Sequence, residues 1–186
     1  MTNTVSESTK ISKTQWTRIN VLTTGGTIEK TYDESDGTLF NRETVIKQKI
    51  NSKLRLPYTE IIVHAIMAKD SLDMDESDRV KITKTIQKFA DDKHPVVILH
   101  GTDTMQHTAE KVCSLIGRPS VPVIFTGAMK PMGFEDSDAL QNVTEALMAA
   151  QLVPPGVYIS FHNRLFQVPG VQKNRELGTF EIIPSK

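Results

Sequence analysis

Short apolar segments that are typical of β-strands alternate with segments of helical period along most of this 186-residue chain. The strand-like segments are residues 18–22, 60–68, 95–99, 121–126 and 157–161, and the helical segments are residues 42–54, 76–90, 105–116 and 138–151. This alternation is typical of a parallel sheet, because each parallel connection needs a long crossover that a helix usually supplies. We therefore predict an α/β fold, a single three-layer domain with a mostly parallel sheet and helices on both of its faces.

The length and the charge balance restrict the domain organisation and the partners. A chain of 186 residues suits one domain with a substantial core. Its 22 basic and 22 acidic residues cancel, so we expect neither nucleic acid nor a membrane as a partner. Residues 1–15 are polar and predict a disordered tail, which leaves residues 16–186 as the folded domain. The single cysteine, Cys113, fits a reducing compartment, and we expect a cytoplasmic protein.

Two short loops directly follow strand-like segments and carry threonine beside glycine. Thr24-Gly25-Gly26-Thr27 follows residues 18–22, and His100-Gly101-Thr102-Asp103-Thr104 follows residues 95–99. In a parallel sheet the carboxyl ends of the strands form the edge where ligands bind. A threonine hydroxyl is a potential nucleophile, and exposed backbone N–H groups can stabilise an oxyanion. The glycine pair lacks the lysine of a phosphate-binding loop and the three-glycine spacing of a dinucleotide site, which disfavours nucleotide binding.

Two long segments lack a clear period. Residues 30–40 are polar and follow the first threonine loop, which favours either a lid over the site or a solvated hairpin. Residues 163–180 show no periodicity, so we expect Lys173 to lie outside any helix or strand. The five histidines have no ligand spacing, and we expect no metal site. We expect His100 to pack at a strand end with its ring hydrogen-bonded locally, and Cys113 to pack in a helix.

Five segments, in the same order along the chain, resemble signatures of the bacterial-type L-asparaginase family. They are Thr24-Gly25-Gly26-Thr27-Ile28, Asp70-Ser71-Leu72-Asp73-Met74, His100-Gly101-Thr102-Asp103-Thr104-Met105, Thr126-Gly127-Ala128-Met129-Lys130-Pro131, and Val171-Gln172-Lys173-Asn174 with Thr179-Phe180. The resemblance implies the parallel α/β domain that carries the chemistry in that family, where a smaller second domain follows it. Because the sequence stops just past the lysine segment, we expect the catalytic domain alone, either as a short single-domain form or as a truncated one.

The resemblance also implies catalytic roles for individual residues. Thr27 is the expected nucleophile, which attacks the side-chain amide carbon of the substrate and releases ammonia. Thr102, Asp103 and Lys173 form a second group, in which the lysine lies close to the Thr102 hydroxyl and that hydroxyl positions water or relays a proton. Tyr32 is the expected activating tyrosine, although it follows Thr27 more closely than the corresponding tyrosine does in two-domain relatives.

The same resemblance implies how the substrate is held. The substrate-binding residues are expected to be Gly26, Ser71, Gly101, Thr102 and Asp103. Asp103 would face the α-ammonium, while Ser71 and the backbone near Gly101 and Thr102 would bind the α-carboxylate. Leu72 stands where the family usually has glutamine, and the second domain, which supplies another carboxylate, is missing from this sequence. Both differences predict weaker binding of the substrate.

These patterns predict an amidohydrolase that converts L-asparagine to L-aspartate and ammonia through a threonine nucleophile, without a cofactor. Two alternatives stay open. One is an amidase of another substrate such as glutamine, including one that supplies ammonia for transamidation on transfer RNA. The other is a domain that senses asparagine without turnover, which the joint presence of Thr27, Thr102, Asp103 and Lys173 disfavours. The resemblance implies a homo-oligomer, for which we expect a homodimer.

Overall fold

The computed structural model describes residues 16–33, 38–41 and 45–184, so the tail expected at residues 1–15 lies outside the described residues. The strands are β1 (Thr17–Gly25), β2 (Lys30–Asp33), β3 (Thr38–Asn41), β4 (Thr59–Lys69), β5 (Val96–Leu99), β6 (Pro122–Thr126), β7 (Gly156–Phe161), β8 (Arg164–Gln167), β9 (Val171–Asn174) and β10 (Thr179–Ile182). The helices are α1 (Val45–Lys53), α2 (Glu76–Asp91), α3 (Met105–Ile116) and α4 (Ala139–Leu152). Single turns of 3₁₀ helix, η2 (Thr27–Glu29) and η3 (Ser71–Asp73), follow β1 and β4.

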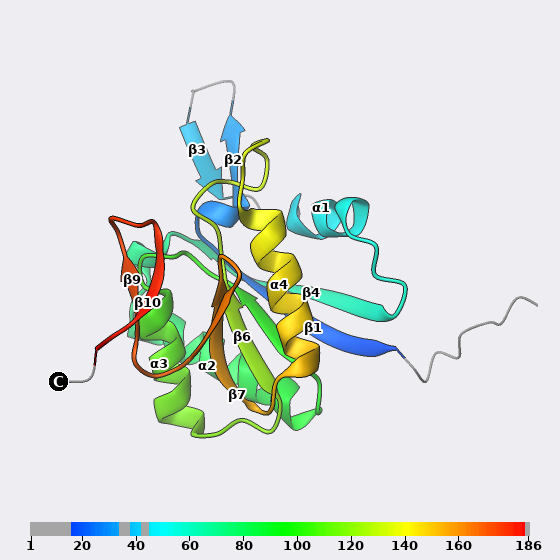
Figure 1. Ribbon diagram of the computed structural model, residues 1–186, viewed down its shortest axis with the longest axis vertical. Helices are drawn as coiled ribbons and strands as arrows, with labels where there is room; N and C mark the ends of the chain where they lie inside the picture. The colour runs from blue at the N-terminus through cyan, green and yellow to red at the C-terminus, as the bar shows by residue number, and fades with distance from the viewer. Residues whose placement is uncertain (1–15, 34–37, 42–44, 185–186) are drawn as a thin grey trace, which may run out of the picture.

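Six strands form the central sheet in the order β4-β1-β5-β6-β7-β8. The first five run parallel, and β8 pairs antiparallel with β7 at one edge. Thr23 of β1 pairs with Leu99 of β5, and Leu99 pairs with Thr126 of β6, so the carboxyl ends of these three strands lie level. The predicted mostly parallel sheet is confirmed. Figure 1 shows α4 crossing the strands on one side of the sheet.

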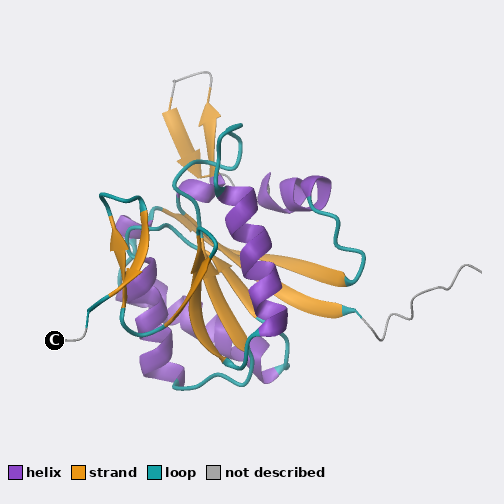
Figure 2. Ribbon diagram, in the orientation of Figure 1, coloured by secondary structure: helices purple, strands orange, loops and turns teal. Residues whose placement is uncertain are grey.

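Helices cover both faces of the sheet, which confirms the three-layer architecture (Figure 2). Helices α2 and α3 pack on one face, where Ile86 and Ile98 belong to one apolar cluster. Helices α1 and α4 pack on the other face, where Val143 and Leu99 belong to a second cluster. Neighbouring residues of a strand point to opposite faces, so the fully buried strand β5 supplies side chains to both clusters.

The four predicted helices are present, with ends set by local contacts. Helix α2 begins at a capping box, in which the Asp75 side chain accepts a hydrogen bond from the Asp78 N–H at 3.0 Å. The Asp78 carboxylate accepts in turn from the Asp75 N–H at 3.1 Å. Helix α1 is described from Val45 onwards, and residues 42–44 of the predicted helix lie outside the described residues.

The structure corrects the interpretation of residues 163–180 and shows two paired strands within residues 30–41. Lys173 lies in strand β9, which pairs antiparallel with β10, so the expectation of an irregular segment there is wrong. Each of these strands has only four residues and one partner strand, so the sequence shows no clear alternation of apolar and polar residues. Strands β2 and β3 pair antiparallel, which both a lid and a solvated hairpin allow, so the function of residues 30–40 stays a prediction. Within the described ranges, none of the helices combines the length and the apolar character needed to cross a bilayer.

Candidate active site

The strand order places a topological switch point at the carboxyl edge of the sheet between β1 and β5. From β1 the chain leads to α1 on one face, and from β5 it leads to α3 on the other. Such a reversal separates the two connections, and ligands bind in the gap outside the strand ends. Thr27 begins the turn η2 after β1, and Thr102 lies in the loop after β5. The two predicted threonines therefore lie in the two loops at this switch point.

Glycines allow the loops at this edge to touch. Gly26 has a φ of +81°, and a Cβ at this position would lie 2.4 Å from the Cα of Gly101. A Cβ on Gly101 would lie 2.6 Å from the Ser71 Oγ. Neither position has room for a side chain, so the segments after β1, β4 and β5 are in direct contact. The structure thus brings together Gly26, Gly101 and Ser71, three of the predicted substrate-binding residues.

Lys173 reaches this edge from the β9–β10 hairpin. Its Nζ donates hydrogen bonds to the Thr102 Oγ1 at 2.7 Å and to the Asp103 Oδ1 at 3.1 Å. The Lys173 side chain is 12% exposed and Thr102 is 4% exposed, so the contact is shielded from bulk water. Phe180, which pairs with Lys173 across the hairpin, packs against Phe161 with ring centroids 5.1 Å apart. This aromatic contact anchors the hairpin to the core and positions the lysine.

Ser71 presents a buried hydroxyl at the same edge. The residue is 1% exposed, and its Oγ makes no hydrogen bond within the part of the chain that the structure describes. Its carbonyl accepts a hydrogen bond from the Thr104 Oγ1 at 2.7 Å, which fixes the serine to the loop after β5. A buried hydroxyl without a protein partner is costly unless a ligand or water satisfies it. This arrangement suits a ligand-binding group.

An ion pair lies beside Ser71. Lys30 Nζ is 2.9 Å from the Asp70 Oδ2, and this hydrogen bond lowers the pKa of Asp70 below its ordinary value. Asp70 also accepts a hydrogen bond from the Leu72 N–H at 3.1 Å. The pair therefore connects the segment after β1 to the segment after β4, and the lowered pKa keeps the Asp70 carboxylate ionised at neutral pH.

His100 supports the loop after β5 from within the core, as predicted. Its Nδ1 lies 2.8 Å from the Gly101 carbonyl oxygen, and its Nε2 lies 2.9 Å from the Thr108 Oγ1. A carbonyl only accepts, so Nδ1 carries the proton and Nε2 accepts from Thr108, whose oxygen accepts from Arg79. Burial lowers the pKa of His100 to about 4, and the Arg79 charge adds to this effect, while the Gly101 hydrogen bond opposes it. The ring is therefore neutral at pH 7.

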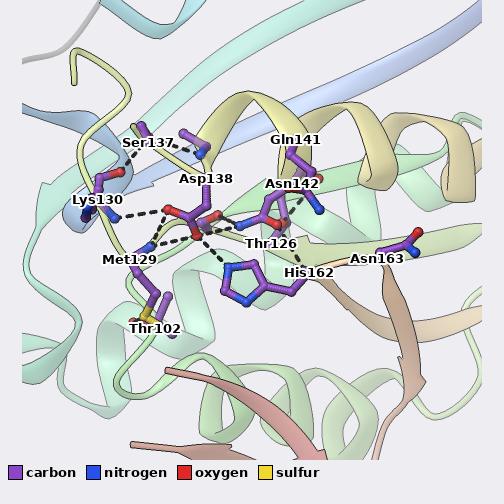
Figure 3. A network of polar contacts seen from close by, with 12 residues as sticks. Thr102, Thr126, Met129, Lys130, Ser137, Asp138, Gln141, Asn142, His162 and Asn163 are labelled. Carbon is purple, nitrogen blue, oxygen red and sulfur yellow. Dashed lines mark hydrogen bonds and ion pairs between the residues drawn. The ribbon is translucent and has the colours of Figure 1, made fainter. Parts of the chain in front are cut away.

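A second polar network positions the loop after β6 (Figure 3). The Asp138 carboxylate accepts hydrogen bonds from the backbone N–H groups of Met129 and Lys130 at 3.0–3.1 Å. It also accepts from the Asn142 Nδ2 and contacts the His162 Nε2, both at 2.9 Å. Burial alone would raise the pKa of Asp138, but these hydrogen bonds outweigh it and hold the pKa below its ordinary value. The carboxylate thus remains charged and fixes the loop.

The loop that Asp138 holds contacts Thr102 through the sulfur atom of Met129. The Thr102 hydroxyl donates to the Met129 Sδ at 3.8 Å, so the loop that Asp138 holds contacts Thr102 directly. Sequence reasoning missed Asp138 and His162. The position of Asp138 directly before a helix predicts a capping residue, which concealed its contact with the loop after β6. In the structure its side chain makes no capping hydrogen bond to the backbone of α4.

Two further residues, Tyr32 and Arg175, bear on the predicted site. Tyr32 is 59% exposed on β2, and no hydrogen bond joins it to Thr27 within the described residues. The activating role of Tyr32 therefore stays a prediction. Arg175, which the sequence analysis did not consider, places its Nη2 2.9 Å from the Asp103 Oδ1. Among the residues that the structure describes, no group of three histidine, cysteine, aspartate or glutamate side chains could hold a metal ion.

Comparisons with known proteins identify the family and the fold of this chain. A family described as "Asparaginase, N-terminal" matches residues 18–182. The L-asparaginase of Thermococcus kodakarensis is 31% identical over 161 residues, which are 87% of this chain and 49% of that protein. A glutamyl-tRNA(Gln) amidotransferase component of Haloquadratum walsbyi is 30% identical over 148 residues, which are 77% of this chain and 33% of that protein. The solved structure of the thermostable T. kodakarensis L-asparaginase has a TM-score of 0.82 at 30% identity and covers 91% of this chain and 52% of its own.

The fold and the site together define a parallel α/β domain with a threonine, carboxylate and lysine cluster at its carboxyl edge. The chain belongs to the asparaginase family, as the resemblance predicted, and it corresponds to the amino-terminal domain of its relatives. It spans about half the length of the T. kodakarensis protein and about a third of the H. walsbyi protein.

Proposed function

We propose that this protein hydrolyses the side-chain amide of L-asparagine to L-aspartate and ammonia, with Thr27 as the nucleophile. The observation that carries the proposal is the cluster in which Lys173 Nζ contacts the Thr102 Oγ1 at 2.7 Å and the Asp103 Oδ1 at 3.1 Å. Such a cluster at the ligand-binding edge of the sheet supplies the proton path that amide hydrolysis needs. The names of relatives such as the T. kodakarensis L-asparaginase support the same reaction.

In the first step the Thr27 oxygen attacks the amide carbon of the substrate. The tetrahedral intermediate collapses when the C–N bond breaks, and the nitrogen takes a proton and leaves as ammonia. Thr27 then carries an aspartyl ester. Backbone N–H groups of the loop after β5, including that of Thr102, would stabilise the oxyanion. A neutral threonine needs a base or a proton path, and we assign Tyr32 to this activation.

In the second step water hydrolyses the ester, with the Thr102 hydroxyl in position to orient it. That hydroxyl accepts from Lys173 and donates to the Met129 sulfur, which is a weak acceptor. A water molecule or a substrate oxygen is a stronger acceptor, so the Thr102 proton can turn toward it at little cost. Lys173 would then supply or remove the compensating proton, with Asp103 as its counter-ion.

The substrate would be held through both charges of its amino-acid group. We assign the Ser71 hydroxyl and the backbone near Gly26, Gly101 and Thr102 to the α-carboxylate. The support for Ser71 is its buried Oγ, for which the described part of the chain offers no hydrogen-bond partner. We assign Asp103 to the α-ammonium, because it is the carboxylate next to Thr102 in the loop after β5 and is partly exposed.

Steady-state ammonia release from L-asparagine tests the proposal, with Lys173→Met as the decisive variant. We expect kcat to fall by about 10²–10⁴, the range for a general acid–base group. Lys84→Met, at an exposed lysine of α2, is the matched control and should keep its activity. Near-normal turnover by Lys173→Met would contradict the assignment of the β9–β10 hairpin to the catalytic site.

Glutamine is the second candidate substrate, because the H. walsbyi relative is named as part of a glutamyl-tRNA(Gln) amidotransferase. Glutamine exceeds asparagine by one methylene group, and a pocket discriminates such a difference by about 10–200-fold. The ratio of kcat/KM for the two amides decides between them. A higher kcat/KM for glutamine than for asparagine would identify glutamine as the preferred substrate. The mechanism through the threonine nucleophile would be unchanged.

A further inference from the structure

We propose that Arg175 reduces the recognition of a substrate α-ammonium, so that the site also takes side-chain amides of dicarboxylic acids that bear no amino group. The inference deepens the proposed function and rests on the assignment of Asp103 to that ammonium. Its basis is the guanidinium of Arg175, whose Nη2 lies 2.9 Å from the same Asp103 oxygen that Lys173 contacts.

The position of Arg175 is set by the hairpin that carries it. Arg175 directly follows β9 in the turn that leads to β10. Asn174 fixes that turn, because its Oδ1 accepts from the Leu177 N–H at 2.9 Å and its Nδ2 donates to the Glu181 Oε2 at 2.8 Å. The packing of Phe180 on Phe161 holds the hairpin against the core. The contact of Arg175 with Asp103 therefore comes from a fixed backbone.

The two cations occupy the acceptor capacity of one carboxylate oxygen. A carboxylate oxygen has about two lone-pair sites, and Lys173 and Arg175 both use Oδ1 of Asp103. While both cations are in place, an arriving ammonium can therefore use at most Oδ2. The local group of Asp103, Lys173 and Arg175 carries a formal charge of +1, compared with 0 for Asp103 and Lys173 without Arg175, and this excess charge repels a further cation.

Lys173 and Arg175 differ in how readily a substrate can displace them from Asp103. The Lys173 side chain is 12% exposed and also bonded to Thr102, so it stays in place. The Arg175 side chain is 69% exposed, so substrate can displace it at a small cost. The neighbouring pair of Lys30 with Asp70 is neutral as a unit and does not restore a negative potential. Arg175 is therefore the residue that sets the strength of ammonium recognition.

L-Asparagine and 3-carbamoylpropanoate form a matched pair of substrates for the test, since they differ only in the α-amino group. The quantity measured is the ratio of kcat/KM for asparagine to kcat/KM for 3-carbamoylpropanoate, in the wild-type protein and in Arg175→Gln. We expect the substitution to raise this ratio about three- to tenfold through a lower KM for asparagine, with 3-carbamoylpropanoate changed less than twofold. Arg118→Gln, which removes a positive charge near Pro155 at the other end of β7, should leave the ratio unchanged.

A rise in the ratio of less than threefold in Arg175→Gln, or a fall, would overturn the inference. Absence of amide hydrolysis by the wild-type protein would instead refute the proposed function. In that case calorimetry can measure the dissociation constants of asparagine and 3-carbamoylpropanoate in Thr27→Ala and in the double variant Thr27→Ala/Arg175→Gln. The preference for asparagine over 3-carbamoylpropanoate should again rise at least threefold when Arg175 is replaced.

Discussion

Replacement of His100 by asparagine should remove much of the acid sensitivity of the fold between pH 7 and pH 5. The wild-type ring is buried and neutral, and its pKa is lowered from 6.5 to about 4, mainly by burial. The unfolded chain therefore binds this proton more readily, so stability is present above pH 6.5 and is lost as the pH falls toward 4. The full difference corresponds to about 3 kcal/mol at 1.36 kcal/mol per pH unit.

About 2 kcal/mol of this loss falls between pH 7 and pH 5. Urea unfolding at both pH values measures it, and His100→Asn, which cannot titrate, should lose about 2 kcal/mol less than the wild-type protein over the same interval. His64, whose pKa burial also lowers, is present in both proteins and cancels in the comparison. An equal loss in the two proteins would refute the assignment of a neutral, buried ring to His100.

Two further predictions concern the loops of the site. Gly26→Ala should lower the free energy of unfolding in urea by about 3 kcal/mol, because Gly26 has a φ of +81° and an added Cβ would lie 2.4 Å from the Gly101 Cα. Gly170→Ala is the control and should lower it by about 1 kcal/mol, because Gly170 has a φ of +96° but open space around it. Equal costs would show that the loops can separate. Asp138→Asn should cost about 2 kcal/mol and lower kcat about tenfold by loosening the loop that contacts Thr102, while the exposed Asp136→Asn should change neither. A normal kcat in Asp138→Asn would exclude a positioning role.

The central sheet was predictable because its parallel strands are buried on both faces and read as continuous apolar runs. Strand β5, for instance, consists of Val96, Val97, Ile98 and Leu99, all fully buried. The hairpin of β9 and β10 was not predictable, because four-residue strands with one partner leave no periodic signal. What places Lys173 in the site is the packing of Phe180 on Phe161, a contact between distant segments of the chain.

The candidate site was predictable where its members occur in short contiguous segments. Thr102 and Asp103 are adjacent, and the structure joins them to Lys173 as the resemblance implied. Arg175 and Asp138 escaped because their significance depends on which distant group they contact. Arg175 contacts Asp103 of the loop after β5, and the Asp138 carboxylate accepts hydrogen bonds from the backbone of the loop at Met129. Sequence spacing carries no information about such contacts.

In the proposed reaction Thr27 bears the acyl group, and acid quenching of the first turnover with L-asparagine tests this step directly. Peptide mass mapping of the quenched protein should find an aspartyl ester on the peptide that contains Thr27, and Thr27→Ala should show neither this ester nor more than about a thousandth of the wild-type kcat. An ester on the peptide that contains Thr102, or ammonia released in the first turnover without an ester on either threonine, would contradict the account.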